Sequence, residues 1–312
     1  MSEAQKGILA MVGACCIWGL SALYYKLVAH VPPLEVLSHR TLWSLVFFGI
    51  VLALQGRLAE VARLFRAPRV LGLVFLAALM ISANWFMFIY SVQTGHAMQA
   101  SLGYYIFPLV AVMLGFVLLG ERLSAGKWAA VGLAAAAVGV LTWGLGVAPW
   151  ISLAIAFTFG FYGLLKRGSP AGPVVSVTTE VLLLSPLALV WLWGVHAQGW
   201  EGLVGRNLGT FGHNLRDSLI LAASGVLTGG PLVLFSYASK RVSFATVGLV
   251  QYLNPTLQFL VATLAFAEPM TKWHAIAFPM IWVALAIYSL QSLRQDRAAR
   301  RAAPSAGTSP TT

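Results

Sequence analysis

Residues 88–124 read FIYSVQTGHAMQASLGYYIFPLVAVMLGFVLLGERLS, and residues 235–271 read FSYASKRVSFATVGLVQYLNPTLQFLVATLAFAEPMT. A constant shift of 147 positions, from 88 to 235, aligns the two stretches without a gap. The shift pairs, among others, Phe88 with Phe235, Tyr90 with Tyr237, Tyr105 with Tyr252, Pro108 with Pro255, and Glu121 with Glu268. Proline and glutamate are uncommon inside apolar helices, so their agreement at one shift indicates an internal repeat.

The segments that precede these two stretches also repeat. A shift of 141 positions aligns Gly19 with Gly160 and Lys26 with Arg167. The chain is therefore predicted to contain two copies of one unit, at residues 6–146 and 148–293. We interpret Glu121 and Glu268, which follow corresponding apolar segments, as loop or packing determinants of each unit.

The composition predicts a membrane protein. The chain has 312 residues, of which 59% are hydrophobic and 9% are charged. A soluble domain carries about 25% charged residues, so this chain has too few to cover a water-exposed surface. Its first apolar run, residues 7–27, is too long for the apolar core of a signal peptide and is predicted to be the first transmembrane span.

Ten apolar segments reach the length that a spanning helix needs. They are residues 7–27, 35–54, 70–92, 98–119, 126–146, 148–165, 173–194, 217–238, 244–267 and 272–293. Residues 55–69 mix arginines with apolar residues and are predicted to contain a short amphipathic helix on the membrane surface. The basic segment 294–312 is predicted to be a disordered tail.

The basic residues predict the orientation. If the N-terminus is cytoplasmic, 15 Lys and Arg lie in inner segments, 4 lie in outer ones, and Arg40 lies inside the second span. Positive residues concentrate on the cytoplasmic side, so both termini are predicted to be cytoplasmic. The net charge of +11 has the same origin, and no basic soluble domain is present to bind nucleic acid.

The number of spans fixes how the two units relate. Each predicted unit holds five spans, an odd number, so the second unit enters the membrane in the opposite direction from the first. Inverted repeats of this kind are typical of secondary transporters, which bind solutes where the repeats meet. The sequence thus predicts an all-helical membrane protein of ten helices in two inverted five-helix repeats.

Short motifs resemble the EamA-type permeases of the drug/metabolite transporter superfamily, in their RarD branch. They are Trp18-Gly19-Leu20, Leu23-Tyr24-Tyr25-Lys26-Leu27, Glu35-Val36-Leu37-Ser38-His39-Arg40, Trp43-Ser44, Asn84-Trp85, Ala100-Ser101-Leu102-Gly103-Tyr104, Gly120-Glu121-Arg122, Thr179-Glu180 and Gln251-Tyr252. Gln99 and Phe107 depart from the pattern, which carries glutamate and asparagine there. The resemblance covers residues 6–293. It implies a permease, often an exporter, of small metabolites or drugs across the bacterial inner membrane, without a cofactor.

Polar and aromatic residues within the spans are predicted to line a central cavity. The predicted set is Trp18, Tyr25, Asn84, Trp85, Ser101, Tyr104, Glu180, Gln251 and Asn254. The alternative is that these groups join helices by hydrogen bonds. Pro108 and Pro255 are predicted to kink two repeat-related helices beside the cavity, because proline frees the carbonyl four residues earlier. The spacing Gly225-x-x-x-Gly229 favours close helix approach.

Charged residues in the spans suggest further roles. Glu180 is predicted to face the cavity and act in coupling or substrate binding, the alternative being a partner for Lys166 or Arg167. Lys26, Glu35 and Arg40 are predicted to form an outer gate, with a Lys26–Glu35 pair closing its mouth. Anchoring at the membrane interface is the alternative for this group.

Catalytic and metal sites are not predicted. The chain lacks the zinc-protease, serine-hydrolase and phosphate-loop motifs. Cys15 and Cys16 are adjacent and suit neither a disulfide framework nor a metal site. The expected partners are a small-molecule substrate, the lipid bilayer and, in one possible assembly, a second copy of the chain. A membrane receptor, a scaffold or an enzyme without transport activity remains the alternative class.

Overall fold

The computed structural model describes residues 1–167, 171–201, 209–242 and 244–302, and every long regular element in these ranges is a helix. Within them, eight helices are long and apolar enough to cross a membrane. They are α1 (Glu3–Leu27), α2 (Pro33–Leu54), α4 (Pro68–Gln93), α5 (Ala97–Leu119), α6 (Ala125–Leu145), α8 (Pro173–Gln198), α9 (Leu215–Ser239) and α12 (Lys272–Ala302). The predicted all-helical membrane class is confirmed.

Two of the ten predicted spans look different in the structure. The sixth is α7 (Trp150–Lys166), whose 17 residues extend about 26 Å, slightly less than the hydrocarbon thickness of a bilayer. The ninth is broken into α10 (Phe244–Gln251), α11 (Leu253–Leu260) and a π-helical turn, Val261–Ala265. The break at Tyr252 lies just before Pro255, whose missing N–H leaves the Gln251 carbonyl without its helical partner. In contrast, α5 continues through Pro108.

The predictions for the two basic segments need correction. The amphipathic helix is present as α3 (Leu58–Phe65), but its buried Val61 and Leu64 pack against a cluster that includes Phe48 and Val181 of α2 and α8. Its apolar face is therefore covered partly by protein rather than by lipid alone. The segment from Arg294 was predicted to be disordered, yet α12 continues to Ala302. The remainder of that tail, 303–312, lies outside the described residues.

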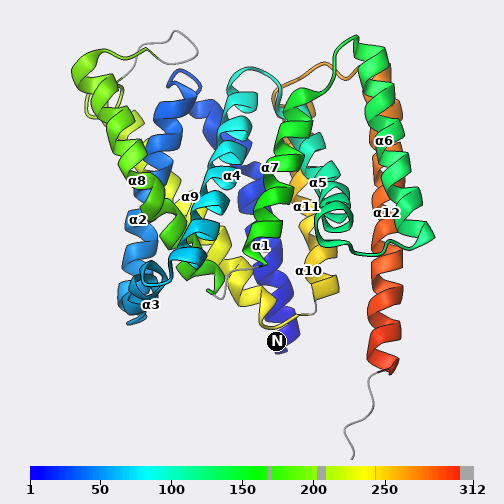
Figure 1. Cartoon of the computed structure of the whole chain (residues 1–312). Coiled ribbons are helices and arrows are strands. Elements are labelled where there is room, and N and C mark those ends of the chain that lie inside the picture. The colour runs from blue at the N-terminus through cyan, green and yellow to red at the C-terminus, as the bar shows by residue number, and fades with distance from the viewer. Residues whose placement is uncertain (168–170, 202–208, 243, 303–312) are drawn as a thin grey trace, which may run out of the picture.

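The helices form one bundle in which successive long helices run in opposite directions (Figure 1). The N-terminus and the end of α12 lie at the same end of the bundle, together with α3 (Figure 1). The central helices pack in pairs: α5 with α7, α4 with α7, α1 with α9 and α11, and α2 with α8 and α9. Helices α6 and α12 pack against each other at one edge (Figure 1).

Glycine allows α2 and α9 to approach closely. A Cβ atom at Gly225 would collide with the main chain of Trp43, and one at Gly229 would collide with the Phe47 ring. The close approach predicted from Gly225-x-x-x-Gly229 is confirmed, and its partner is α2. This packing holds the first part of the chain against the second, beside the cavity described next.

Candidate functional site

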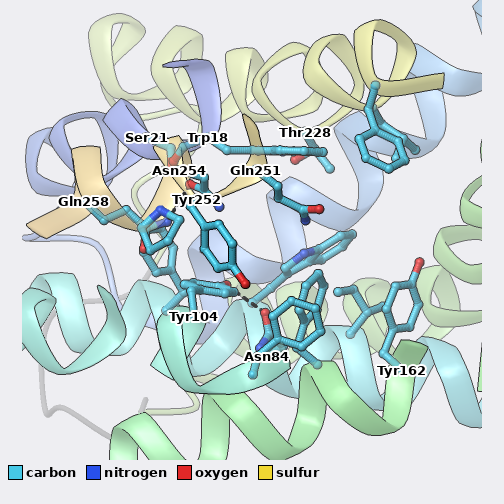
Figure 2. Close-up of a pocket in the computed structure, with 18 of the residues that line it drawn as sticks. Trp18, Ser21, Asn84, Tyr104, Tyr162, Thr228, Gln251, Tyr252, Asn254 and Gln258 are labelled. Carbon is cyan, nitrogen blue, oxygen red and sulfur yellow. Dashed lines mark hydrogen bonds between the residues drawn. The ribbon is translucent and has the colours of Figure 1, made fainter. Parts of the chain in front are cut away.

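A cavity of about 350 Å³ lies in the centre of the bundle. Figure 2 shows side chains from many helices pointing into it. Its walls come from every long helix except α6, and from both halves of the sequence. This volume is in the ~300–1,000 Å³ range typical of small-molecule sites.

Most of the predicted cavity residues surround this space. Those that line it are Trp18, Tyr25, Asn84, Trp85, Tyr104, Gln251 and Asn254, together with Pro108, Pro255 and Arg40. The structure thus places Arg40 on the cavity wall rather than at an outer gate. A role of these residues in binding a solute stays a prediction.

Sequence reasoning missed a second group of lining residues. They are Phe88, Phe107, Phe159, Tyr162, Thr228, Phe235, Tyr252, Gln258 and Tyr288. Phe159 and Tyr162 are three residues apart, the spacing of one helix face, and this signal was available in the sequence. The aromatic rings make the wall mainly apolar, and the hydroxyl and amide groups supply hydrogen-bonding positions.

Ser101 and the predicted Lys26–Glu35 pair are not part of the cavity. The Ser101 hydroxyl donates to the Pro255 carbonyl oxygen at 2.9 Å and is fully buried, which is the helix-joining alternative. Among the described residues, no ion pair joins Lys26 to Glu35. Lys26 lies over the ring of Phe266, with its Nζ 5.3 Å from the centroid.

The buried Glu35 carboxylate instead holds a segment before α9. It accepts hydrogen bonds from the backbone N–H groups of Gly209 at 3.1 Å and Thr210 at 2.9 Å. These two N–H donors stabilise the negative charge of the Glu35 carboxylate by hydrogen bonds, without a neighbouring cation among the described residues. The predicted closing pair at the outer mouth is therefore wrong for this conformation.

Asn84 and Tyr104 form a fixed polar unit in the cavity wall. The Tyr104 hydroxyl donates to Asn84 Oδ1 at 2.8 Å (Figure 2). Asn84 Nδ2 donates to the Ile155 carbonyl oxygen at 3.0 Å and to Thr158 Oγ1 at 3.2 Å. The amide is thereby oriented by α7, and its position on the wall is set before any solute arrives.

Arg40 contributes a buried positive charge to the cavity wall. Its side chain is 7% exposed, and its Nη1 donates to the Tyr25 hydroxyl at 2.5 Å. The guanidinium carbon lies 4.2 Å from the centroid of the Trp85 ring, a cation–π contact. Its buried Nε has no hydrogen-bond partner among the described residues. Within the described parts of the chain, no Asp or Glu lines the cavity.

Glu180 lies behind the wall, in a paired cluster. Its fully buried carboxylate accepts from Lys166 Nζ at 2.7 Å, from Ser176 Oγ at 2.9 Å and from the Tyr162 hydroxyl at 3.1 Å. Of these partners only Tyr162 lines the cavity. The predicted direct exposure of Glu180 to the cavity is therefore wrong, and its alternative as a partner of Lys166 matches the structure.

The described part of the chain contains no candidate metal site. No group of three or more His, Cys, Asp or Glu side chains in it is arranged to hold a metal ion. Cys15 is buried and donates weakly to the Val250 carbonyl oxygen at 3.5 Å, and Cys16 is also a free thiol. The chemistry available at the cavity is thus recognition by aromatic, amide, hydroxyl and guanidinium groups.

Comparison with known proteins identifies the family. Residues 5–143 match the model of the EamA-like transporter family. The chain is 40% identical to a Streptomyces exfoliatus protein named RarD, covering 96% of this chain and 93% of that one. It is 38% identical to an uncharacterized transporter of Vibrio cholerae, covering 96% and 97%.

A solved crystal structure of another protein shares the fold. It has a TM-score of 0.59 and 20% identity, and the match covers 91% of this chain and 98% of that one. At this identity the likeness concerns the fold alone. The family model and the name of the Vibrio cholerae relative both give a class of transporters rather than enzymes. The chain therefore belongs to the EamA-like transporter family, among the homologues of RarD.

Proposed function

We propose that this protein is a secondary carrier that exports small metabolites or drugs across the bacterial inner membrane by alternating access. The observation that carries the proposal is the central cavity, whose wall is shared by the two halves of the sequence. A site between two halves can be exposed to either side of the membrane when the halves rock against each other. The family to which the chain belongs supports the same activity.

The packing of the helices supports two inverted repeats. Under the repeat, α1 corresponds to α7, α2 to α8, α4 to α9, α5 to α10 and α11, and α6 to α12. If each helix is replaced by its counterpart in the other half, the α5–α7 contact predicts a contact between α11 and α1. In the same way, α4–α7 predicts α9–α1, and α2–α9 predicts α8–α4. All six of these packings occur. The opposite directions of corresponding helices, such as α1 and α7, agree with the inversion (Figure 1).

The broken ninth span supplies a place for movement. Helix α10 ends at Gln251, α11 begins at Leu253, and a π-helical turn follows at Val261–Ala265. Discontinuous helices with free carbonyls are recurrent features of transporter binding sites. Gln251 and Pro255 at this break both line the cavity, so a change in the break would change the wall directly.

The lining residues favour a particular class of solute. Rings from Trp18, Trp85 and other aromatic residues suit a planar apolar body, while the Gln251 amide and the Asn84 Oδ1 acceptor suit polar substituents. We therefore propose ring-bearing, amphipathic metabolites or drugs as substrates. The charge bias of the sequence supports an inner-membrane orientation with both termini cytoplasmic.

Counterflow in liposomes tests the proposal. Purified protein is reconstituted, loaded with one unlabelled ring-bearing solute at a time, and assayed for uptake of the same labelled solute. We expect protein-dependent, saturable exchange for a subset of solutes, and Asn84→Ala should reduce it. Empty liposomes and Arg69→Gln, an exposed residue outside the cavity, are the controls. Leakage equal to empty liposomes for every solute would leave the receptor or scaffold alternative.

A second copy of the chain is proposed only as a possible partner. The cavity is built within a single chain, so transport does not require an assembly. Mass measurement in detergent, with and without added native lipid, separates monomer from homodimer.

A further inference from the structure

Arg40 differs from the other buried charged residues in what surrounds it. Glu180 has Lys166, and Asp217 accepts from His30 at 2.9 Å. Glu35 has two backbone donors. Each buried carboxylate in the described residues thus has a donor that neutralises it or satisfies it. For the Arg40 guanidinium, the one hydrogen bond described goes to an uncharged hydroxyl.

Arg40 lines the cavity and has no acidic partner among the described residues. The Trp85 ring covers one face of the guanidinium, and the Tyr25 hydroxyl occupies Nη1. Arg40, Tyr25 and Trp85 all line the cavity, so the guanidinium group lies beside it, although its Nε is buried without a partner among the described residues. Because Tyr25 Oη accepts from Arg40, its own proton is left to donate elsewhere, and no acceptor for it is described. Arg40 and Tyr25, which are joined by a hydrogen bond, thus bring a positive charge and a hydroxyl proton to the same part of the cavity wall.

A carboxylate fits this place better than other groups. Its two oxygens match the planar fork of a guanidinium, and a charged pair removed from water forms short, strong hydrogen bonds. Arginine keeps its charge in proteins, so the site stays cationic at any physiological pH. A dianion such as a phosphate monoester would bring two charges to a cavity in which Arg40 is the one Lys or Arg that lines the wall in the described ranges.

We propose that the cavity selects small aromatic monoanions, with Arg40 and Tyr25 binding a carboxylate and the surrounding rings binding the aromatic body. This inference rests on the proposed carrier function and names its substrate class. The Gln251 amide and the remaining acceptor capacity of Asn84 Oδ1 then contact the other polar substituents. A cation of similar shape is rejected because Arg40 repels it.

Matched acid and amide ligands test the charge directly. Calorimetric titration of the purified protein in detergent uses phenylacetate, 4-hydroxyphenylacetate and indole-3-acetate, each beside its own carboxamide. We expect at least one acid to bind about tenfold tighter than its amide, about 1.4 kcal/mol. If no acid binds tighter than its amide to the unaltered protein, the inference is overturned, and this comparison needs no variant.

Variants assign the preference to Arg40. In Arg40→Gln the acid should lose about tenfold in affinity while the amide changes less than about twofold. Arg40→Lys keeps the charge but loses the fork, so part of the preference should remain. Arg69→Gln removes a charge outside the cavity and should leave the preference intact. An undiminished preference in Arg40→Gln would assign the anion to another site.

The same protein in liposomes separates this inference from the carrier proposal. Acid preference in detergent without exchange of any solute in liposomes would overturn the carrier and leave the anion site standing. Exchange of neutral ring-bearing solutes without acid preference would overturn the anion site and leave the carrier standing. Exchange of the acid that falls with Arg40→Gln supports both.

Discussion

Arg40 and Glu180 occupy matching positions in α2 and α8. The two helices begin at Pro33 and Pro173, and each charged residue follows its proline by seven positions. Both side chains are buried, with 7% and 0% of their surface exposed. Glu180 has an opposite charge beside it in Lys166, whereas Arg40 has none among the described residues. The same position therefore carries a neutralised charge in one half and an available charge in the other.

The contacts of the two residues correspond as well. Tyr25 and Lys166 match each other under the shift of 141 positions, and they are the partners of Arg40 and Glu180 respectively. In the first half, the contact between Tyr25 and Arg40 holds a positive charge at the cavity wall. In the second half, Lys166 and Glu180 form an ion pair, and Tyr162 lies between this pair and the cavity. Under the proposed repeat, this difference between the halves agrees with a binding site that carries its charge on one side.

The first prediction concerns the stability of these two sites. Glu180→Gln should lower the apparent unfolding free energy by about 1–3 kcal/mol, because it leaves Lys166 without its charged partner. Lys166 is 22% exposed, so water moderates the loss. Arg40→Gln should lower the unfolding free energy by less, or raise it, because it leaves no oppositely charged group without a partner. Thermal melting of the purified variants measures both changes.

A double-mutant cycle tests the pairing itself. Lys166→Met combined with Glu180→Gln should cost less than the sum of the single changes, since each single change leaves one buried partner behind. Additive effects would show that the Lys166–Glu180 pair is not the source of the stability. Counterflow on the same variants shows whether the pair also has a part in transport.

The second prediction concerns the start of α5. The Glu268 carboxylate accepts from the backbone N–H groups of Ala97 and Met98, each at 2.7 Å. A negative charge at a helix N-terminus interacts favourably with the helix dipole and with its free donors. Glu268→Gln should lower stability by about 1 kcal/mol, and melting by roughly 2–4 °C. Exposed Glu201→Gln is the control, and an equal melting temperature in both variants would exclude the cap.

Hydropathy predicted most helix bounds, because lipid requires a long apolar run wherever a helix crosses. The second span was predicted at 35–54, and α2 is Pro33–Leu54. The break at Tyr252 was not predicted, although Pro255 was recognised, because Pro108 has the same chemistry in a helix that continues. A proline can break a helix or can only remove one of its hydrogen bonds. Which of the two happens depends on whether neighbouring groups form hydrogen bonds with the backbone atoms that the proline leaves free.

The site was predictable in outline but not in its contacts. Asn84 and Gln251 were placed correctly at the cavity wall because polar groups in a span face the protein interior. The donors to Glu35 are backbone atoms of Gly209 and Thr210, more than 170 positions away, and backbone groups leave no residue signature in a sequence. Lys26 lies just across the first predicted outer loop from Glu35, and this short distance along the chain misled the assignment.

The third prediction concerns orientation across the membrane. A phosphatase that is active only outside the cytoplasm should be inactive when fused after Gln291 and active when inserted after Gly199. The end of α8 and the N-terminus lie at opposite ends of the bundle, so the two fusions should give opposite results (Figure 1). A fluorescent protein that folds only in the cytoplasm should give the reverse pattern. An active phosphatase after Gln291 would contradict the cytoplasmic C-terminus.

The fourth prediction distinguishes the cavity wall from helix-joining contacts. In a background with Cys15→Ala and Cys16→Ala, single cysteines are introduced at Asn84, Gln251 and Ser101. A membrane-impermeant thiol reagent should label Asn84→Cys and Gln251→Cys, because both positions line the cavity.

Ser101→Cys should react at least about tenfold more slowly than Gln251→Cys. Both residues were predicted from the sequence to face the cavity, but the Ser101 side chain is fully buried and bonded to the Pro255 carbonyl oxygen. A sulfhydryl there is held between α5 and α11, where a charged reagent cannot enter without separating the helices. Equal labelling at Ser101 and Gln251 would mean that α5 and α11 part during the transport cycle. Protection of all three positions from both sides of the membrane would instead assign the polar residues to helix association and remove the cavity from the proposed mechanism.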